Sequence, residues 1–242
     1  MRRLVALVPT VTLCLCSVGI AHLSLAQGGA AVLAQSTSFA ARLRANLPER
    51  GVPGSRFGGA TRGACVTGNQ RLTALVPSTN VGQTTLAAPT LFVFVPPSKA
   101  RQGELVITDA QDQPLATMVV DLPAELGVMA LKPKVQLQPG QDYRWTFTLL
   151  CGADADDPSA FISVSGVVSR VQPSTDLAKK LQGKSVGDRL GAAVDAGLWY
   201  ETLAILAELQ RDQTTREMAR REWVAVLSAV GLDGLAQAPL VQ

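Results

Sequence analysis

Tyr143-Arg144-Trp145-Thr146-Phe147-Thr148-Leu149 is the stretch of sequence that decides the fold class. Its apolar and polar residues alternate strictly, and a period of two is typical of a β-strand with one buried face. The same alternation recurs at residues 162–168. Residues 91–95 are apolar without interruption, which predicts a central strand covered on both faces. The middle of the chain is therefore expected to form β-sheet.

Shorter candidate strands complete this region, and turns such as Pro96-Pro97 and Pro139-Gly140 separate them. No helical periodicity intervenes, so the sequence predicts an immunoglobulin-like antiparallel β-sandwich over residues 56–172. The shorter strands are expected at residues 71–76, 104–108, 115–120 and 135–137.

Gly140 ends a Pro-Gly turn three residues before Tyr143, an arrangement similar to the tyrosine corner of immunoglobulin-like sandwiches. In that motif the phenol bonds back across the connection between the two sheets. An ordinary turn that leads into an aromatic strand is the alternative interpretation.

The apolar period changes to that of a helix after Gln172-Pro173-Ser174. Thr214 and Glu217 have the spacing of a capping box at a helix start, and Gly231 is placed to end that helix. Two apolar stripes joined by a short polar connection predict an antiparallel helical hairpin over residues 173–242, and the fold class is α+β. The stripes consist of Leu190, Val194, Leu198, Ile205 and Leu209, and of Ala219, Trp223, Val226, Leu227 and Val230.

The first 26 residues are predicted to be a signal peptide. Arg2 and Arg3 form a positively charged start, and a long uncharged apolar stretch follows. Small residues at Ser24 and Ala26 fit the −3 and −1 positions of a cleavage site, and a second acceptable site ends at Ala34. A retained membrane anchor is the alternative.

The following segment, residues 27–55, is rich in Ala, Gly, Ser and Gln and is predicted to be a flexible linker. A short helix at residues 39–47 fits the pattern of this segment as well. The sandwich and the helical segment follow it.

Composition excludes several classes of function. The 242 residues include 22 Lys and Arg, 19 Asp and Glu, four Cys and one His. Loss of the signal peptide removes Arg2, Arg3, His22 and two of the cysteines, which leaves 20 basic residues, 19 acidic residues and no histidine. A Ser-His-Asp or Cys-His catalytic apparatus and a His-ligated metal are thereby excluded, and the balanced charge gives no reason to expect nucleic acid. In the periplasmic or extracellular location that export implies, Cys65 and Cys151 are candidates for a disulfide, with two separate buried thiols as the alternative.

Five segments stand out in order along the chain: Gly58-Gly59-Ala60-Thr61-Arg62-Gly63-Ala64-Cys65, Leu72-Thr73-Ala74-Leu75-Val76-Pro77, Pro89-Thr90-Leu91-Phe92-Val93-Phe94-Val95-Pro96, Tyr143-Arg144-Trp145, and Ala196-Gly197-Leu198-Trp199-Tyr200-Glu201-Thr202-Leu203. Together they resemble the DUF928 family, exported proteins of unknown function found mainly in cyanobacteria. The resemblance extends from about Gly58 to Leu240. It implies an envelope or extracellular setting, and it implies no activity, cofactor or catalytic residue.

Asp154, Asp156 and Asp157 cluster after Cys151 and offer three hard oxygen ligands for Ca²⁺. The segment lacks the glycine and the terminal Glu of an EF-hand, so solvated carboxylates are the simpler interpretation. A glycosidase pair requires a defined separation that neighbouring loop positions do not supply.

The glycine-rich residues 54–61 resemble a phosphate-binding loop in spacing, but Ala60 stands where a lysine is needed, so no nucleotide is expected. Three tryptophans, Trp145, Trp199 and Trp223, could stack on a sugar, although core packing is favoured because they lie in or beside apolar stripes. The remaining candidates are charged and predict a solvated or mixed surface: Lys179, Lys180 and Lys184, and Arg211, Arg216, Arg220 and Arg221 among acidic neighbours.

Two functions therefore compete. The favoured one is a non-enzymatic exported envelope protein that acts as an adaptor and binds a protein partner through a sandwich edge or the helical hairpin. If the helical hairpin is the docking surface, Arg216 and Arg220 are expected to contribute to docking. The alternative is a carbohydrate- or calcium-binding module, or a hydrolase that uses the loop carboxylates. No catalytic residue, cofactor, metal, nucleotide or nucleic acid is assigned, and the membrane is contacted only through an uncleaved N-terminal segment.

Overall fold

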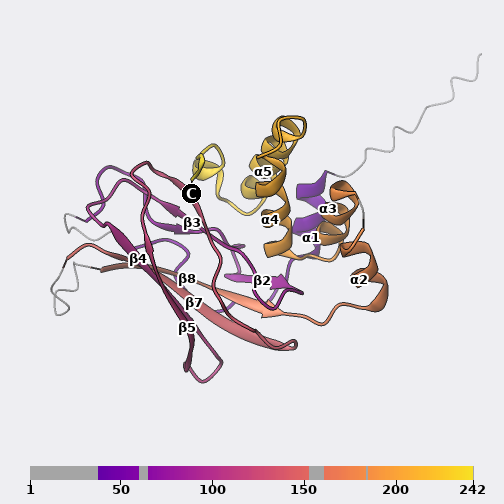
Figure 1. The fold of residues 1–242 in the computed structure, drawn as a ribbon, viewed down its shortest axis with the longest axis horizontal. Coiled ribbons are helices and arrows are strands. Elements are labelled where there is room, and N and C mark those ends of the chain that lie inside the picture. Colours follow the sequence, from indigo (N-terminus) through magenta and orange to yellow (C-terminus); the bar gives the residue numbers. More distant parts are fainter. Residues whose placement is uncertain (1–37, 60–64, 153–160, 184, 242) are drawn as a thin grey trace, which may run out of the picture. The chain divides into compact units, whose positions relative to one another are not determined.

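A computed structural model describes residues 38–59, 65–152, 161–183 and 185–241 (Figure 1). The chain divides into a unit of residues 1–36 and a unit of residues 37–242, and all described residues belong to the second unit. The expected signal peptide and the acidic cluster after Cys151 lie outside the described residues. None of the helices in the described part combines the length and apolarity that a membrane crossing requires.

Five strands form the larger sheet in the order β2-β8-β7-β4-β5. The alternating stretch around Trp145 lies in β7 at the centre of this sheet, where Tyr143, Trp145, Phe147 and Leu149 are buried. β7 pairs antiparallel with both β4 and β8, β4 pairs antiparallel with β5, and β2 pairs parallel with β8. The strands are β2 (Val81–Thr84), β4 (Gln102–Thr108), β5 (Pro114–Asp121), β7 (Gln141–Leu150) and β8 (Phe161–Arg170).

Four strands form the second sheet in the order β1-β3-β6-β9. All five residues of β3 are buried, as the uninterrupted apolar run predicted. β3 pairs antiparallel with β1 and β6, whereas β9 pairs parallel with β6. Side chains of both sheets contribute to one core cluster. The strands are β1 (Thr73–Ala74), β3 (Leu91–Val95), β6 (Gly127–Leu131) and β9 (Leu240–Val241).

The α+β class is confirmed, and the sheets differ from the predicted antiparallel sandwich because each contains one parallel pair. The sequence did not predict strands β2, β6 and β9, because they are short or lack alternation of apolar and polar residues. For example, β2 contains Gly82 and Gln83, and β9 has two residues. Residues 135–137 were wrongly predicted as a strand. Val135 and Leu137 are buried, but the Leu137 N–H donates to the Ala87 carbonyl in a loop at 2.9 Å.

Tyr143 makes the contact that the tyrosine-corner pattern predicted. Its phenol oxygen accepts a hydrogen bond from the backbone N–H of Gln138 at 2.8 Å. Because Gln138 precedes the Pro-Gly turn, this bond closes the entry to β7. Arg170, at the end of β8, donates to the carbonyls of Leu137 and Thr85 and so ties the same connection to β2 and β8.

In place of the predicted hairpin, the described residues of the C-terminal segment form four α-helices and the short 3-10 helix η2 (Asp233–Leu235). The apolar stripe from Leu190 to Leu209 belongs to two helices, because Gly197 adopts φ +66° and ends the first of them. Such a left-handed conformation favours glycine. A Cβ at Gly197 would also collide with the carbonyl oxygen of Asn46. The helices are α2 (Thr175–Leu181), α3 (Val186–Asp195), α4 (Trp199–Leu209) and α5 (Arg216–Ala229).

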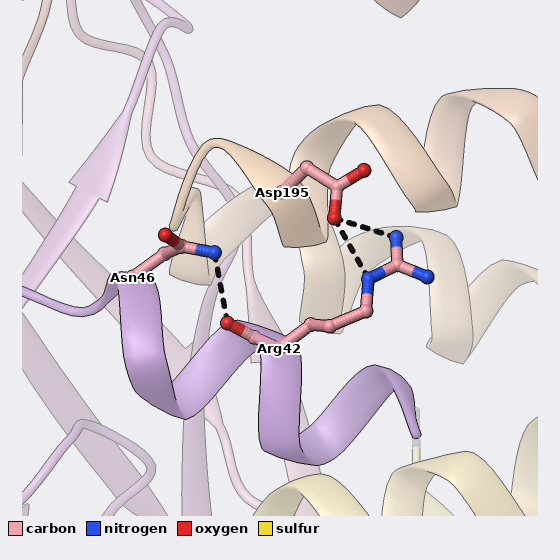
Figure 2. A network of polar contacts seen from close by, with 3 residues as sticks. All are labelled: Arg42, Asn46 and Asp195. Atoms are coloured by element: carbon pink, nitrogen blue, oxygen red, sulfur yellow. Dashed lines mark hydrogen bonds and ion pairs between the residues drawn. The ribbon is translucent and has the colours of Figure 1, made fainter. Parts of the chain in front are cut away.

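Part of the predicted linker is a packed helix, α1 (Phe39–Asn46), which contacts α3 and α5. Leu43 is buried in this contact, and Arg42 joins α1 to the end of α3 by an ion pair with Asp195 (Figure 2). The Arg42 Nε and Nη2 atoms lie 2.8 Å and 2.6 Å from the same carboxylate oxygen of Asp195. The N-terminal segment therefore helps to hold the helices in place.

One end of α5 agrees with the sequence expectation and the other does not. Gly231 ends the helix as predicted, with φ +74°. The predicted capping box is absent, because Thr214 bonds to Asp212 and the Thr215 hydroxyl donates to the Leu209 carbonyl at 2.7 Å. At the other end, Arg56 donates to the carbonyls of Val230 and Gly231 and so satisfies the end of α5.

The start of α4 is joined to the larger sheet by buried hydrogen bonds. The Tyr200 phenol oxygen accepts from Trp145 Nε1 at 3.0 Å and donates to the Val167 carbonyl at 3.0 Å. Trp199 Nε1 donates to the Leu75 carbonyl at 2.9 Å. We call this set of contacts the Trp-Tyr junction. All three aromatic side chains are at most 1% exposed, so each polar atom needs its partner inside the protein.

Two glycines make room for the Trp-Tyr junction. A Cβ at Gly82 would lie 2.7 Å from Tyr200 Cε2 and 2.9 Å from Trp199 Cδ1. A Cβ at Gly166 would lie 2.7 Å from Val76 Cγ1 and 3.0 Å from Trp145 Nε1. Distances of this size are too short for carbon atoms in contact, so the backbone of β2 and β8 must lack side chains at these positions.

Gly82→Ala is expected to destabilise the protein by about 1–3 kcal/mol, because the added methyl group overpacks the junction. Chemical denaturation measures the effect. Gly234→Ala is the matched control, since a Cβ there would meet no atom within 4 Å. Equal midpoints for the two variants would show that the junction tolerates the added carbon.

Glu201, the residue after Tyr200, binds α4 to the turn that follows β2. Its Oε1 atom accepts from the Thr85 N–H at 2.6 Å and from the Thr85 hydroxyl at 2.8 Å, while Oε2 is buried with no partner in the described part of the chain. Burial raises the pKa of the Glu201 carboxyl, and the Thr85 bonds oppose this shift.

Glu201→Gln is expected to raise the free energy of unfolding at pH 8 and to have a smaller effect at pH 4. A raised folded-state pKa means that the wild type loses stability as pH rises from the unfolded pKa through the folded one. The glutamine keeps an acceptor for Thr85 and carries no charge. Urea unfolding at both pH values measures the difference, and a gain confined to pH 4 would contradict the assignment.

Candidate functional site

A pocket of about 510 Å³ opens between the α4–α5 connection, one face of α5 and the C-terminal segment. Its size lies within the range of ligand pockets in proteins. Three arginines line it, and none of the acidic side chains that the structure describes does. We call it the arginine pocket. Its lining residues are Gln210, Arg211, Arg216, Arg220, Trp223, Ala236, Gln237, Ala238, Pro239, Leu240 and Val241.

Helical spacing brings the charged residues to this pocket. Arg216, Arg220 and Trp223 stand at positions i, i+4 and i+7 of α5 and therefore share one face. Trp223 is buried and packs edge-on against Phe92 of β3, with ring centroids 5.6 Å apart. That contact fixes the rotation of α5 and leaves the two arginines exposed beside the pocket.

Polar contacts from the pocket wall orient two of the arginines. Arg216 Nε donates to the Gln210 carbonyl at 3.1 Å, and Arg220 Nη2 donates to Gln237 Oε1 at 3.3 Å. Both acceptors are uncharged. The ion pairs found within the described residues involve Arg42 and Arg50, so no carboxylate there pairs with an arginine of the pocket.

Asp212, the residue after Arg211, is engaged in its own turn. Asp212 is fully exposed and accepts hydrogen bonds from the Thr214 N–H and hydroxyl. These bonds, with a smaller effect of the Arg216 charge, lower the pKa of the Asp212 carboxyl. Asp212 thus stays ionised in its own turn, and its side chain is absent from the pocket lining.

Two further lining residues carry hydrogen-bond donors without acceptors. Trp223 Nε1 and Gln210 Nε2 are buried, and neither has a partner among the described residues. A buried donor without an acceptor costs about 1–3 kcal/mol, so such groups call for an explanation. Since neither atom is accessible to solvent, a ligand in the open pocket would not contact them.

The charge of the pocket is therefore one-sided, since the charged side chains that line it within the described residues are all guanidiniums. Guanidinium groups bind carboxylate and phosphate oxygens, often with two parallel hydrogen bonds. The arrangement suits an anionic ligand.

The model of the Domain of Unknown Function (DUF928) family matches residues 57–240. The chain belongs to the DUF928 family. A search of curated proteins finds no match. The matched range includes every residue of the arginine pocket except Val241.

In this DUF928 chain the two cysteines that were predicted as a candidate disulfide lie close together. Cys65 and Cys151 have Cα atoms 5.4 Å apart, within the usual range for a disulfide. Cys65 precedes Val66, which forms a β-bridge with Ser98, and Cys151 follows the last residue of β7. The cysteine pair therefore connects these two parts of the chain. Paired cysteines at this distance are consistent with an oxidising, exported location.

The other candidate residues that the structure describes lie in the core, bond to the backbone or are exposed to solvent. Trp145, Trp199 and Trp223 are at most 2% exposed, so they form core and no sugar-stacking platform. Arg56, in the glycine-rich segment, is directed to backbone carbonyls. Lys179 and Lys180 are exposed on α2, and Lys184 lies outside the described residues. The described part of the chain contains no group of three or more His, Cys, Asp or Glu side chains that could hold a metal ion.

Sequence reasoning missed the arginine pocket although it considered the arginines. Counted along the chain, Arg216 and Arg220 alternate with acidic residues and indicate a mixed surface. On the helix, both arginines lie on the same face as Trp223, whereas Glu217 and Arg221 do not line the pocket. That i, i+4, i+7 spacing was the available signal, but the C-terminal strand that closes the pocket gave none.

Proposed function

We propose that this DUF928 protein is a non-enzymatic, exported envelope protein that binds an acidic segment of a partner protein in the arginine pocket. The observation that carries the proposal is the one-sided charge of the pocket, which three arginines and, among the described residues, no acidic side chain line. A site of this kind binds acceptor groups and offers no general base or nucleophile.

The location is supported by two independent features. Residues 1–26 have the charge and hydropathy order of a signal peptide, and Cys65 and Cys151 lie at disulfide distance. Both features suit a protein that acts in the periplasm or outside the cell. A protein partner is favoured over a small anion because the pocket is open along a chain segment of six residues, from Ala236 to Val241.

Charge reversal of Arg216→Glu with Arg220→Glu is expected to abolish capture of the partner without unfolding the protein. The tagged full chain is expressed, processed by the cell, and cross-linked in the envelope before purification. Bound proteins are identified by mass spectrometry, and the cross-linked segment of the partner is mapped. We expect one stoichiometric protein that is cross-linked through a segment rich in Asp or Glu.

Lys179→Glu with Lys180→Glu is the matched control, because it makes the same charge change on α2, away from the arginine pocket. Both double variants should have unfolding midpoints close to that of the wild type, since all four side chains are exposed. Equal loss of capture in both variants would point to general charge effects. Undiminished capture by the arginine variant would contradict the proposal.

A further inference from the structure

The floor of the arginine pocket is an edge strand. β9 stands last in the order β1-β3-β6-β9 and pairs on one side with β6, where Leu240 is opposite Val128 and Val241 is opposite Met129. Within the described residues its second edge has no strand beside it. Leu240 and Val241 line the pocket, so this edge and the arginines belong to the same cavity.

A glycine holds β9 close to β6. A Cβ at Gly127 would lie 2.6 Å from the Pro239 carbonyl oxygen and 2.5 Å from Val241 Cγ1. Val128 N–H donates to the same Pro239 carbonyl at 2.7 Å. The short strand is therefore fixed in position by close backbone approach, and its unpaired edge is in place before any ligand arrives.

The backbone pattern shows which groups of β9 remain available. In a parallel pair, alternate residues of a strand direct their N–H and C=O groups to the same neighbour. Because the Pro239 carbonyl points to β6, the N–H and C=O of Leu240 point to the opposite side. One donor and one acceptor of the main chain thus face the unpaired edge, next to guanidinium groups.

We infer that the partner segment binds as an added strand on β9, with alternate acidic side chains directed to Arg216 and Arg220. The inference rests on the proposed function and specifies the conformation and the sequence pattern of the ligand. Addition of an extended peptide to a sheet edge is a common mode of recognition, in which main-chain bonds give affinity and alternate side chains give specificity.

The spacing of the two partners agrees with this pattern. Side chains two residues apart on a strand project on the same side at about 6.6 Å. Arg216 and Arg220 are four residues apart on α5, which corresponds to about 6 Å along the helix axis. For a bound segment that runs along the axis of α5, carboxylates at positions i and i+2 therefore match the spacing of Arg216 and Arg220.

A five-residue acetylated and amidated peptide, Glu-Thr-Glu-Thr-Glu, tests the inference with protein purified from cells that express the full chain. Isothermal titration gives the affinity, and amide exchange followed by NMR reports on Leu240. We expect binding, slower exchange of the Leu240 N–H, and binding at least about tenfold weaker for the Gln-Thr-Gln-Thr-Gln peptide. Arg216→Gln with Arg220→Gln should cause a similar loss, and Lys179→Gln with Lys180→Gln should cause none.

A peptide of the same composition without acids at positions i and i+2, Glu-Glu-Thr-Thr-Glu, separates strand addition from attraction between charges. The alternating peptide should bind more tightly and alone protect Leu240. Equal affinity of the two peptides, or unchanged exchange at Leu240, would overturn the inference. Partner capture that still depends on Arg216 and Arg220 would then leave the proposed function standing, so the two failures are distinguishable. Equal displacement by inorganic phosphate at the same concentration would show an anion site without strand addition.

Discussion

Hydrogen bonds of the Tyr200 phenol oxygen join the helical segment to the larger sheet. This oxygen accepts a hydrogen bond from Trp145 at the centre of β7 and donates one to a carbonyl of β8. Burial raises the pKa of this phenol, so it remains a neutral donor and acceptor. Because no water reaches these atoms, removing one leaves the others without partners, and the position of α4 is tied to the register of the sheet.

The rest of the helical segment depends on that placement. Gly197 turns the chain into α4, Glu201 fixes its first turn to Thr85, and α5 returns along it to contact β3 through Trp223. The C-terminal segment then closes against β6. Figure 1 shows α4 and α5 beside the strands. Since α5 and the C-terminal segment line the arginine pocket, the core contacts that position them also determine its geometry.

Local sequence signals predicted the elements that carry their own periodicity. The strands around Trp145 and the buried run of β3 were found because alternation and burial on both faces are visible in a few residues. β2 and β9 are strands only because β8 and β6 lie beside them, and such pairing has no local signal. Gly197 had the residue type that ends a helix, but an apolar stripe that continued past it concealed the break.

The candidate site was predictable only in part, for the same reason. The cysteine pair followed from export and from the number of cysteines, and the two residues lie at disulfide distance. The arginines were visible in the sequence, but their separation from Glu217 depends on the face of α5 that Trp223 buries. Burial of one aromatic side chain thus decides which charges gather at the pocket.

Native-state hydrogen exchange of the Tyr200→Phe variant tests most directly whether this junction joins the two segments. The phenylalanine keeps the ring in place and leaves Trp145 Nε1 without its acceptor, at an expected cost of about 1–3 kcal/mol. The account predicts that the opening free energies of amides in α4 and in β7 fall together by this amount. A decrease confined to α4, with β7 unchanged, would show that the helices open independently of the sheet and would contradict the account.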